Sequence, residues 1–327
     1  MIPTPSLYIG LRPDDRVESI IREVFNPFSP NFIDITSDLN DLNNVDCLWV
    51  DMTSPIDESL LSRLPKLRYV VSPTTGLTHL GPLANSSGDI EVISLRGERQ
   101  FLEKITSTPE LAWSLALTVW RRIIPASESY TTDIAIRQEF SSKQLNGLTV
   151  GLIGFGRIGR ILNRYAQAFG MKTIFFDPNL LPHDKAFHDG ANQSQAISEV
   201  CQECDILFLV ASHDVNQEES YPILKREHLM QLGSEAIVIN VSRGSLLDES
   251  ALFDLIKDHK IAGAGLDVLA REEKVLSSTS LDPLQNLQRE GYNVVVTPHI
   301  GGMCWDAFDA AQRHVAEKLK TFLHLKA

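Results

Sequence analysis

The stretch LTVGLIGFGRIGRILNRYAQAFGMKTIFFD, residues 148–177, decides the fold of this protein. It begins with an apolar run over 148–154 and ends with another over 172–177, and both runs are typical of buried strands. Between them, apolar residues recur with helical spacing over 157–169. A strand, a helix and a second strand in this order predict a βαβ unit with parallel strands.

The turn between the first strand and the helix has a G-x-G-x-x-G pattern, Gly154-Phe155-Gly156-Arg157-Ile158-Gly159. Here the first glycine allows a tight turn, the second lets a pyrophosphate approach the backbone, and the third permits close helix–strand packing. The unpaired N–H groups and the positive dipole end of the helix favour phosphate binding. The pattern therefore predicts a dinucleotide site, and the alternative is that the glycines only turn a corner.

Asp177 ends the second strand, eighteen residues after Gly159. A carboxylate at this place accepts hydrogen bonds from the ribose hydroxyls and repels a 2′-phosphate. The residues that follow, Pro178-Asn179-Leu180, contain no arginine that could neutralise such a phosphate. The sequence therefore predicts NAD rather than NADP. The alternative is that Asp177 only caps the turn at Pro178.

The alternation of strands and helices extends in both directions from this unit. Further buried strands are predicted at 6–10, 32–35, 45–50, 67–71, 90–95, 205–211, 236–242, 261–268 and 293–299. Helices are predicted over 14–24, 57–64 and 305–323, and from an N-cap at Thr108 to a stop at Pro125. This order predicts an α/β protein whose parallel sheets are covered on both faces.

Composition sets the broad class. The chain has 327 residues, of which 43% are hydrophobic and 22% charged, and a prior of about 150 residues per domain predicts two globular domains. The formal net charge of −12 argues against nucleic acid and anionic membranes as partners, since both favour a basic face. We see no apolar run long enough to span a bilayer and no signal-peptide pattern at the N-terminus.

The four cysteines are too few for a disulfide framework, which predicts a reduced, cytoplasmic protein. Cys201 and Cys204 have C-x-x-C spacing, but no second pair exists to complete a zinc site, so packed thiols and no metal are predicted. Cys304 is also predicted to be packed. The alternative for Cys304 is an exposed thiol that senses oxidants.

Three polar segments interrupt the apolar strand ends in the second half of the chain. They are Asn240–Gly244, Gly265–Val268 with Glu272 shortly after it, and Thr297–Gly302. In an open α/β sheet, ligands bind outside the carboxyl ends of the strands, where all three segments lie. Hydride transfer to a 2-oxo acid requires a guanidinium that binds the carboxylate and polarises the carbonyl, and a His–Glu pair that donates the proton. Arg243, Glu272 and His299 are therefore the predicted catalytic residues.

These motifs resemble those of the D-isomer-specific 2-hydroxyacid dehydrogenases. The matching segments are GLIGFGRIGR, FFDP, INVSRGSLLDESAL, AGAGLDV and VTPHIGG, in the family's order and over most of 145–302. The resemblance implies that Arg243 binds the substrate carboxylate and carbonyl, that His299 is the acid/base, and that Glu272 is its partner. Asp267 would bond to the nicotinamide carboxamide. The predicted NAD contacts are Gly154, Gly156, Arg157, Ile158, Gly159, Asp177, Ser242 and Asp267.

The resemblance also implies a domain organisation. A Rossmann-type NAD-binding domain, 105–298, would be inserted in a flavodoxin-like substrate domain made of 1–104 and 299–327. Helices at 109–124 and 303–323 would cross between the domains, and the protein would be a homodimer. The chain would be phosphoglycerate dehydrogenase-like, without a regulatory domain.

The segment Thr74-Thr75-Gly76-Leu77 looks like the family's substrate-carboxylate loop, in which backbone N–H groups do the binding. Thr75 and Gly76 are therefore predicted to bind substrate, and Gly76 permits a close approach. A simple turn is the alternative interpretation of this segment.

Some positions depart from the family pattern. Ala270 stands where an acidic residue is common, and Glu273 stands where a proline is common, which makes Glu273 an alternative partner for His299. A loop insertion is predicted over 276–288. Formate dehydrogenases pair their His with Gln, so Glu272 argues against that activity. Phosphite oxidation, and an NAD-sensing corepressor of the same fold, remain alternative functions.

Overall fold

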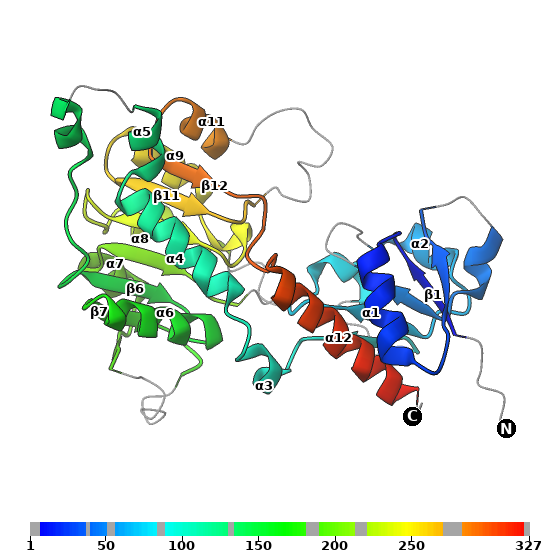
Figure 1. The fold of residues 1–327 in the computed structure, drawn as a ribbon. Helices are drawn as coiled ribbons and strands as arrows, with labels where there is room; N and C mark the ends of the chain where they lie inside the picture. Colours follow the sequence, from blue (N-terminus) through cyan, green and yellow to red (C-terminus); the bar gives the residue numbers. More distant parts are fainter. Residues whose placement is uncertain are drawn as a thin grey trace. The chain divides into compact units, whose positions relative to one another are not determined.

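The computed structural model of the chain describes residues 7–36, 40–50, 56–83, 89–129, 134–180, 190–212, 221–270 and 283–323. The chain divides into two compact units (Figure 1). Unit 1 consists of Met1–Ile105 and Met303–Ala327, and unit 2 of Thr106–Gly302. Each unit has its own parallel sheet with helices on both faces.

The sheet of unit 1 has five parallel strands in the order β2-β1-β3-β4-β5. The strands are β1 (Tyr8–Leu11), β2 (Asn31–Asp34), β3 (Cys47–Trp49), β4 (Tyr69–Ser72) and β5 (Glu91–Ser94). This is the strand order of the flavodoxin-like fold. The predicted fold class is thereby confirmed for this unit.

Helices pack on both faces of the unit 1 sheet because successive strand residues point to opposite sides. The helices are α1 (Asp15–Phe25), α2 (Glu58–Ser62), α3 (Arg99–Leu102) and α12 (Trp305–Phe322), with 3-10 turns η1 (Asn40–Asn44) and η2 (Thr78–Leu83). α1 and α12 lie side by side against one core (Figure 1). α1 begins where the Asp14 carboxylate accepts from the N–H groups of Arg16 and Val17.

The sheet of unit 2 has seven parallel strands in the order β12-β11-β10-β9-β6-β7-β8. They are β6 (Thr149–Ile153), β7 (Lys172–Phe176), β8 (Asn192–Gln193), β9 (Ile206–Leu209), β10 (Ile237–Asn240), β11 (Gly263–Leu266) and β12 (Val294–Val296). Counted from β6, the order contains the 3-2-1-4-5-6 arrangement of the Rossmann fold. The two-residue strand β8 was not predicted.

The helices of unit 2 also form two layers. They are α4 (Ser107–Trp120), α5 (Ile123–Glu128), α6 (Arg157–Ala168), α7 (Ile197–Glu203), α8 (Arg226–Leu229), α9 (Glu249–Lys257) and α11 (Pro283–Arg289), with 3-10 turns η3 (Ile134–Phe140) and η6 (Gly244–Leu246). α4 and α6 share one hydrophobic core with the sheet, whereas α7, α8 and α9 share the other. Both faces of the sheet are therefore covered (Figure 1).

The helix predicted between Thr108 and Pro125 has different ends in the structure. It begins at Ser107, so Thr108 lies inside its first turn rather than at the N-cap. It ends at Trp120, shortly before Arg122 takes a left-handed conformation with φ 50°. Pro125 lies in the first turn of α5 instead of stopping the helix. Proline is tolerated there because first-turn N–H groups have no intrahelical acceptor.

Two other predictions are wrong at least in part. The segment 276–288 was predicted as a loop, but its end belongs to helix α11, where Leu287 is fully buried; the residues up to 282 lie outside the described part. Cys304 is exposed rather than packed. Cys201 and Cys204 are buried as predicted, and burial raises the pKa of the Cys201 thiol to about 12.

Two features that the described residues lack bear on function. None of their helices is both long and apolar enough to cross a membrane. No group of three or more His, Cys, Asp or Glu side chains in these ranges is placed to hold a metal ion.

Replacing Thr173 by valine is expected to raise the free energy of unfolding by about 1 kcal/mol. Thr173 lies in β7, is 4% exposed, and its hydroxyl has no hydrogen-bond partner among the described residues. Valine has the same shape without the desolvated polar group. Urea denaturation measures the change. The matched control is Thr297→Val, which removes a hydroxyl that does donate a hydrogen bond and should lower stability. A Thr173→Val protein less stable than the wild type would contradict the prediction.

Candidate active site

Those predicted catalytic and cofactor residues of unit 2 that the structure describes lie along one edge of its sheet. Because all seven strands are parallel, their carboxyl ends share this edge. Gly154 follows β6, Asp177 follows β7, Arg243 follows β10, Asp267 follows β11 and His299 follows β12. The strand order reverses between β6 and β9, and open α/β sheets bind ligands beside such a reversal.

The three glycines of the turn after β6 have distinct surroundings. Gly154 has φ 100°, and a Cβ added to it would lie 2.7 Å from Ala211 Cα. A Cβ on Gly159 would lie 2.5 Å from Gly154 O, so α6 packs tightly against the turn. At Gly156 no described atom lies within 4 Å of a Cβ position. These surroundings agree with a tight turn at Gly154, an open approach at Gly156 and close helix packing at Gly159.

Helix α6 begins directly at this open backbone. Gly156 is its N-cap, and no side chain caps the first turn of this 12-residue helix. Its positive dipole end can therefore face an anion. Arg157 is half-buried beside it, and burial lowers the pKa of its guanidinium, which stays charged at neutral pH. An open glycine, an uncapped helix and a cation fit the pyrophosphate of a dinucleotide.

Asp177 is connected to the glycine turn. Its Oδ2 accepts a hydrogen bond from Phe155 N (2.8 Å), and its Oδ1 accepts one from Asn179 N (3.0 Å). The second bond is the turn-capping contact that the sequence left open as an alternative. The first bond places the half-buried carboxylate beside the predicted dinucleotide turn, so both interpretations of Asp177 fit the geometry.

The turn after β10 is held by a buried asparagine to which the sequence interpretation gave no role. Asn240 is fully buried; its Oδ1 accepts from Ser242 N (3.0 Å) and its Nδ2 donates to Arg243 O (3.1 Å). The Ser242 hydroxyl donates to Ala211 O at the end of β9. Arg243 Nη1 donates to Ser242 O (2.7 Å). The backbone on both sides of Arg243 is therefore fixed.

Gly244 brings this turn against the segment that follows β11. A Cβ on Gly244 would lie 2.0 Å from Leu269 C and 2.1 Å from Ala270 N. The N–H of Ala270 also donates to Glu249 Oε1 at the start of α9 (2.7 Å). These contacts hold the backbone just before Glu272, which itself lies outside the described residues.

We expect Gly244→Ala to lower the free energy of unfolding by about 2 kcal/mol, because the new methyl group overlaps fixed backbone. The substitution should also weaken 2-oxo acid binding, since Arg243 precedes the displaced residue. Urea denaturation and the KM for the acid measure the two effects. Gly233→Ala is the matched control, because no described atom lies within 4 Å of its Cβ position. Equal stability of the two variants would show that the close approach is unimportant.

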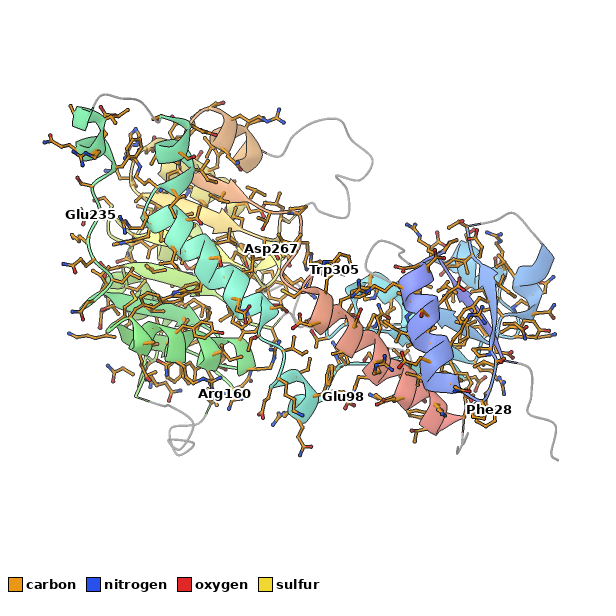
Figure 2. All side chains as sticks on the ribbon, viewed as in Figure 1. Phe28, Glu98, Arg160, Glu235, Asp267 and Trp305 are labelled. Atoms are coloured by element: carbon orange, nitrogen blue, oxygen red, sulfur yellow. The ribbon has the colours of Figure 1, made fainter. Side chains whose placement is uncertain are left out.

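Asp267 joins the end of β11 to the segment after β12. It is 1% exposed, and Figure 2 labels its position in unit 2. Its Oδ1 accepts from the Thr297 hydroxyl (2.6 Å) and Ile300 N (2.8 Å), and its Oδ2 accepts from Gly301 N (2.8 Å). These three donors surround His299 in the sequence. The nicotinamide contact predicted for Asp267 remains a prediction, and the structure adds this second role.

His299 has a left-handed backbone conformation with φ 54°. Its N–H is shared between Asp267 O and Thr297 O (3.0 Å each). A left-handed residue other than glycine costs about 1–2 kcal/mol, and the bonds to Asp267 on both sides offset this cost. The half-buried imidazole is thus held on a strained but fixed turn.

The loop Thr74–Leu77 follows β4 in unit 1. Thr75 is exposed, Gly76 is half-buried and Leu77 is 6% exposed within the core. The N–H groups of Thr75, Gly76 and Leu77 donate no hydrogen bond in the described part of the chain. Free N–H groups on consecutive residues are suited to binding an anion.

The structure therefore assembles much, not all, of the predicted site. Asp267 and His299 are joined by hydrogen bonds, and the turn that carries Arg243 packs through Gly244 against the segment after β11. Glu272 and its alternative Glu273 lie outside the described residues. The residues that the sequence interpretation missed are Asn240, Gly244, Glu249 and Thr297. Asn240 carried a signal, since it is a polar residue at the end of an apolar strand.

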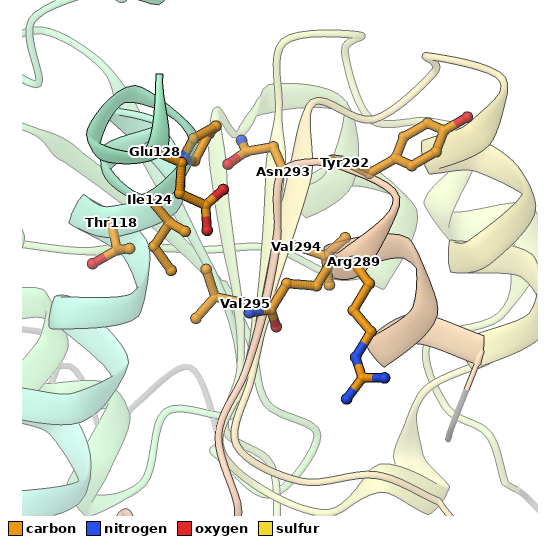
Figure 3. A pocket seen from close by; sticks show the side chains of 11 residues that line it. Thr118, Ile124, Glu128, Arg289, Tyr292, Asn293, Val294 and Val295 are labelled. Carbon is orange, nitrogen blue, oxygen red and sulfur yellow. The ribbon is translucent and has the colours of Figure 1, made fainter. Parts of the chain in front are cut away.

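A cavity of about 200 Å³ in unit 2 lies elsewhere (Figure 3). Thr118 and Ile124 line one side of it, and Arg289 and Tyr292 line the other. Its β12 residues belong to the start of that strand, whereas His299 follows the strand's end. The cavity is therefore separate from the carboxyl edge that carries the predicted residues.

Comparison with known families decides the identity of this arrangement. Residues 113–301 match the sequence profile described as D-isomer specific 2-hydroxyacid dehydrogenase, NAD binding domain. The chain belongs to the D-isomer specific 2-hydroxyacid dehydrogenases. Both the predicted family and the predicted cofactor, NAD, are thereby confirmed.

Two relatives of this dehydrogenase family illustrate its range. The chain is 31% identical over 299 residues to the glyoxylate reductase of Thermococcus litoralis, covering 87% of this chain and 82% of the relative. It is 30% identical over 285 residues to the D-3-phosphoglycerate dehydrogenase of Methanocaldococcus jannaschii, covering 87% of this chain. It spans only 51% of the length of that second relative.

A solved structure of the family supports the fold. The D-lactate dehydrogenase of Aquifex aeolicus, complexed with NAD and lactic acid, has a TM-score of 0.78 to this chain at 22% identity. The match covers 98% of this chain and 96% of the other. The predicted combination of a Rossmann-type and a flavodoxin-like domain is confirmed.

Proposed function

We propose that this protein transfers a hydride between NAD and a D-2-hydroxy acid/2-oxo acid pair. The observation that carries the proposal is that Arg243, Asp267 and His299 follow the neighbouring strands β10, β11 and β12, on the same sheet edge as the glycine turn. A cation and an imidazole placed beside a dinucleotide turn suit the reduction of a carbonyl that carries a carboxylate.

A nicotinamide cofactor bound at the glycine turn would supply the hydride as NADH or accept it as NAD+. The Arg243 guanidinium binds the substrate carboxylate and polarises the carbonyl oxygen. His299 gives a proton to that oxygen during reduction and takes it back during oxidation. Glu272 is proposed as the carboxylate that stabilises the charged imidazole. The backbone N–H groups of Thr75 and Gly76 are proposed as further ligands of the substrate carboxylate.

The remaining cofactor contacts are proposed from the same edge. Gly154, Gly156, Ile158 and Gly159 line the pyrophosphate turn, with Arg157 as its cation. Ser242 and Asp267 face the cofactor from the ends of β10 and β11. Asp177 binds the ribose and selects NAD over NADP, which is supported by its hydrogen bond to Phe155 N of the turn.

The test is turnover of a defined panel of acids. Purified protein is mixed with NADH and glyoxylate, pyruvate or 3-phosphohydroxypyruvate, and the loss of NADH absorbance is followed. These acids are suggested by the names of the relatives and of the solved structure. We expect reduction of at least one acid to the D-2-hydroxy acid. NADH binding without turnover of any panel acid would argue instead for a binding protein such as an NAD-sensing corepressor.

We also propose the setting in which the protein acts. Unit 1 is proposed as the substrate domain and unit 2 as the NAD-binding domain, close to the boundaries 104/105 and 298/299 drawn from the sequence. All four cysteines are free thiols, which supports a reducing cytoplasmic compartment. The net charge of −12 supports the absence of nucleic-acid and membrane partners. A homodimer is proposed from the family, and light scattering after gel filtration tests it.

A further inference from the structure

The carboxylate-binding loop of unit 1 rests on a chain of buried polar groups. Ser72, the last residue of β4, is fully buried, and His79 is 9% exposed. Ser72 Oγ lies 3.0 Å from His79 Nε2 and 2.9 Å from Thr74 Oγ1. The Thr74 hydroxyl donates to Gly76 O (2.8 Å). Four groups are thus connected in one line that ends inside the loop.

The number of protons on each group fixes which group donates and which accepts in each of these hydrogen bonds. The Thr74 hydroxyl has one proton, which goes to Gly76 O, so Thr74 must accept from Ser72. Ser72 then has no proton left for His79, so its oxygen accepts from His79 Nε2. The sequence of donors is His79 Nε2–H, Ser72 Oγ–H and Thr74 Oγ1–H, with the carbonyl of Gly76 as the final acceptor. His79 therefore carries a proton on Nε2.

The final bond sets the orientation of the peptide between Gly76 and Leu77. A peptide is planar and trans, so its C=O and N–H point in opposite directions. With the Gly76 carbonyl held by Thr74, the Leu77 N–H points away from the polar chain, and it donates to no group in the described part of the structure. Hydrogen bonds in a line polarise one another, which makes this N–H a stronger donor.

Backbone hydrogen bonds hold both ends of this line of polar groups. The N–H of Leu95 donates to Thr74 O (3.1 Å), and the N–H of Ile56 donates to His79 O (3.0 Å). Leu77 and Leu80 are buried between them in the core. These polar groups are therefore held between fixed backbone segments.

We infer that the relay His79–Ser72–Thr74 is a positioning device that presents the Gly76–Leu77 peptide N–H to the substrate carboxylate. The inference rests on the proposed function and adds three positioning residues and the Leu77 N–H to it. None of the three side chains touches the reacting atoms. Breaking the relay leaves the peptide free to rotate, so the N–H is no longer preorganised for the carboxylate.

The main test compares Thr74→Val, Ser72→Ala and His79→Leu with the wild type. Each should raise the KM for glyoxylate roughly tenfold, the effect of about one hydrogen bond, with kcat and NADH affinity nearly unchanged. His79→Gln keeps a donor near the Nε2 position and should restore the KM. The double variant Ser72→Ala/Thr74→Val should resemble either single variant, because one interrupted relay cannot be interrupted again.

The matched control is Ser94→Ala. Ser94 is buried in β5 directly opposite Ser72 in the sheet register, and its hydroxyl accepts from Arg96 N (3.2 Å) rather than bonding to the relay. The KM of Ser94→Ala for glyoxylate should equal that of the wild type. A general loss of packing would instead lower the melting temperature and affect kcat and KM in both sets of variants. If His79→Leu fails to fold, the KM of the near-isosteric variant Thr74→Val still tests the inference.

A second measurement does not depend on turnover. Oxamate, a non-reacting carboxylate, is titrated into the protein–NADH complex by calorimetry, and its affinity should fall roughly tenfold in Thr74→Val. Unchanged oxamate affinity in Thr74→Val, or no oxamate binding to the wild type, overturns the inference. Wild-type oxamate binding without turnover of any 2-oxo acid overturns the proposed function alone.

Discussion

Replacing His299 by asparagine is expected to lower kcat for 2-oxo acid reduction by about 10²- to 10⁴-fold, the usual contribution of a general acid. Asparagine is chosen because it tolerates the left-handed conformation that His299 adopts with φ 54°. The backbone turn is therefore kept while the proton donor is lost. NADH affinity should stay near that of the wild type, because the predicted cofactor turn lies at β6.

The chain offers a closely matched control for this substitution. His259 is a second histidine with a left-handed backbone, φ 55°, and it is exposed in the turn after α9. His259→Asn makes the same chemical change on the same backbone conformation, away from the strand ends, and should leave kcat unchanged. Wild-type kcat in His299→Asn, or an equal loss in both variants, would remove His299 from the proposed mechanism.

The second large effect is expected for Asp267→Asn. Three donors face the Asp267 carboxylate at 2.6–2.8 Å. An amide can accept on one side only and presents N–H groups to a donor on the other, so one donor is left buried and unsatisfied. We expect a loss of about 2–3 kcal/mol in the free energy of unfolding. The His299 turn should also lose its fixed position, lowering kcat by roughly 10²-fold.

Thr297→Val is the graded control, since it removes one of the three bonds and keeps the carboxylate. Its kcat and stability should fall between those of the wild type and Asp267→Asn. The free energy of unfolding measured without NADH distinguishes the two roles of Asp267, which are holding the His299 turn and contacting the nicotinamide. If Asp267 acts only on the nicotinamide, Asp267→Asn will weaken NADH binding while the stability of the NADH-free protein stays at the wild-type value.

The fold was predictable where its signals are local. Every strand expected from an apolar run forms, because a run of buried residues between turn signals is sufficient for a strand in a parallel sheet. The wrong predictions of helix bounds concern single residues, Thr108 and Pro125, because the identity of one residue can determine where a helix begins or ends. A further wrong prediction concerns 276–288, where the end of the expected loop belongs to helix α11 and Leu287 is buried in the core of unit 2.

The candidate site also has features that the sequence predicts and features that it does not. The glycine turn and Asp177 belong to one βαβ unit, and glycine alone accepts φ 100° beside a neighbouring backbone, so the residues themselves predict the geometry. Arg243 and His299 were predicted from their chemistry and their motifs. The partners that hold them could not be identified in that way, because Asn240 and Thr297 look like ordinary polar residues at strand ends.

Amino-acid order alone was sufficient for the family, the cofactor and the main acid/base candidate, since each depends on residue types at short spacing. Tertiary packing assigned the supporting roles. Asp267 receives its three bonds from residues thirty or more positions later, and Gly244 is required because the chain after β11 passes against it. The direction of the His79 relay follows from hydroxyl groups meeting in a buried space with one proton each. Such contacts depend on where parallel strands end in space, and no local pattern in the sequence records that position.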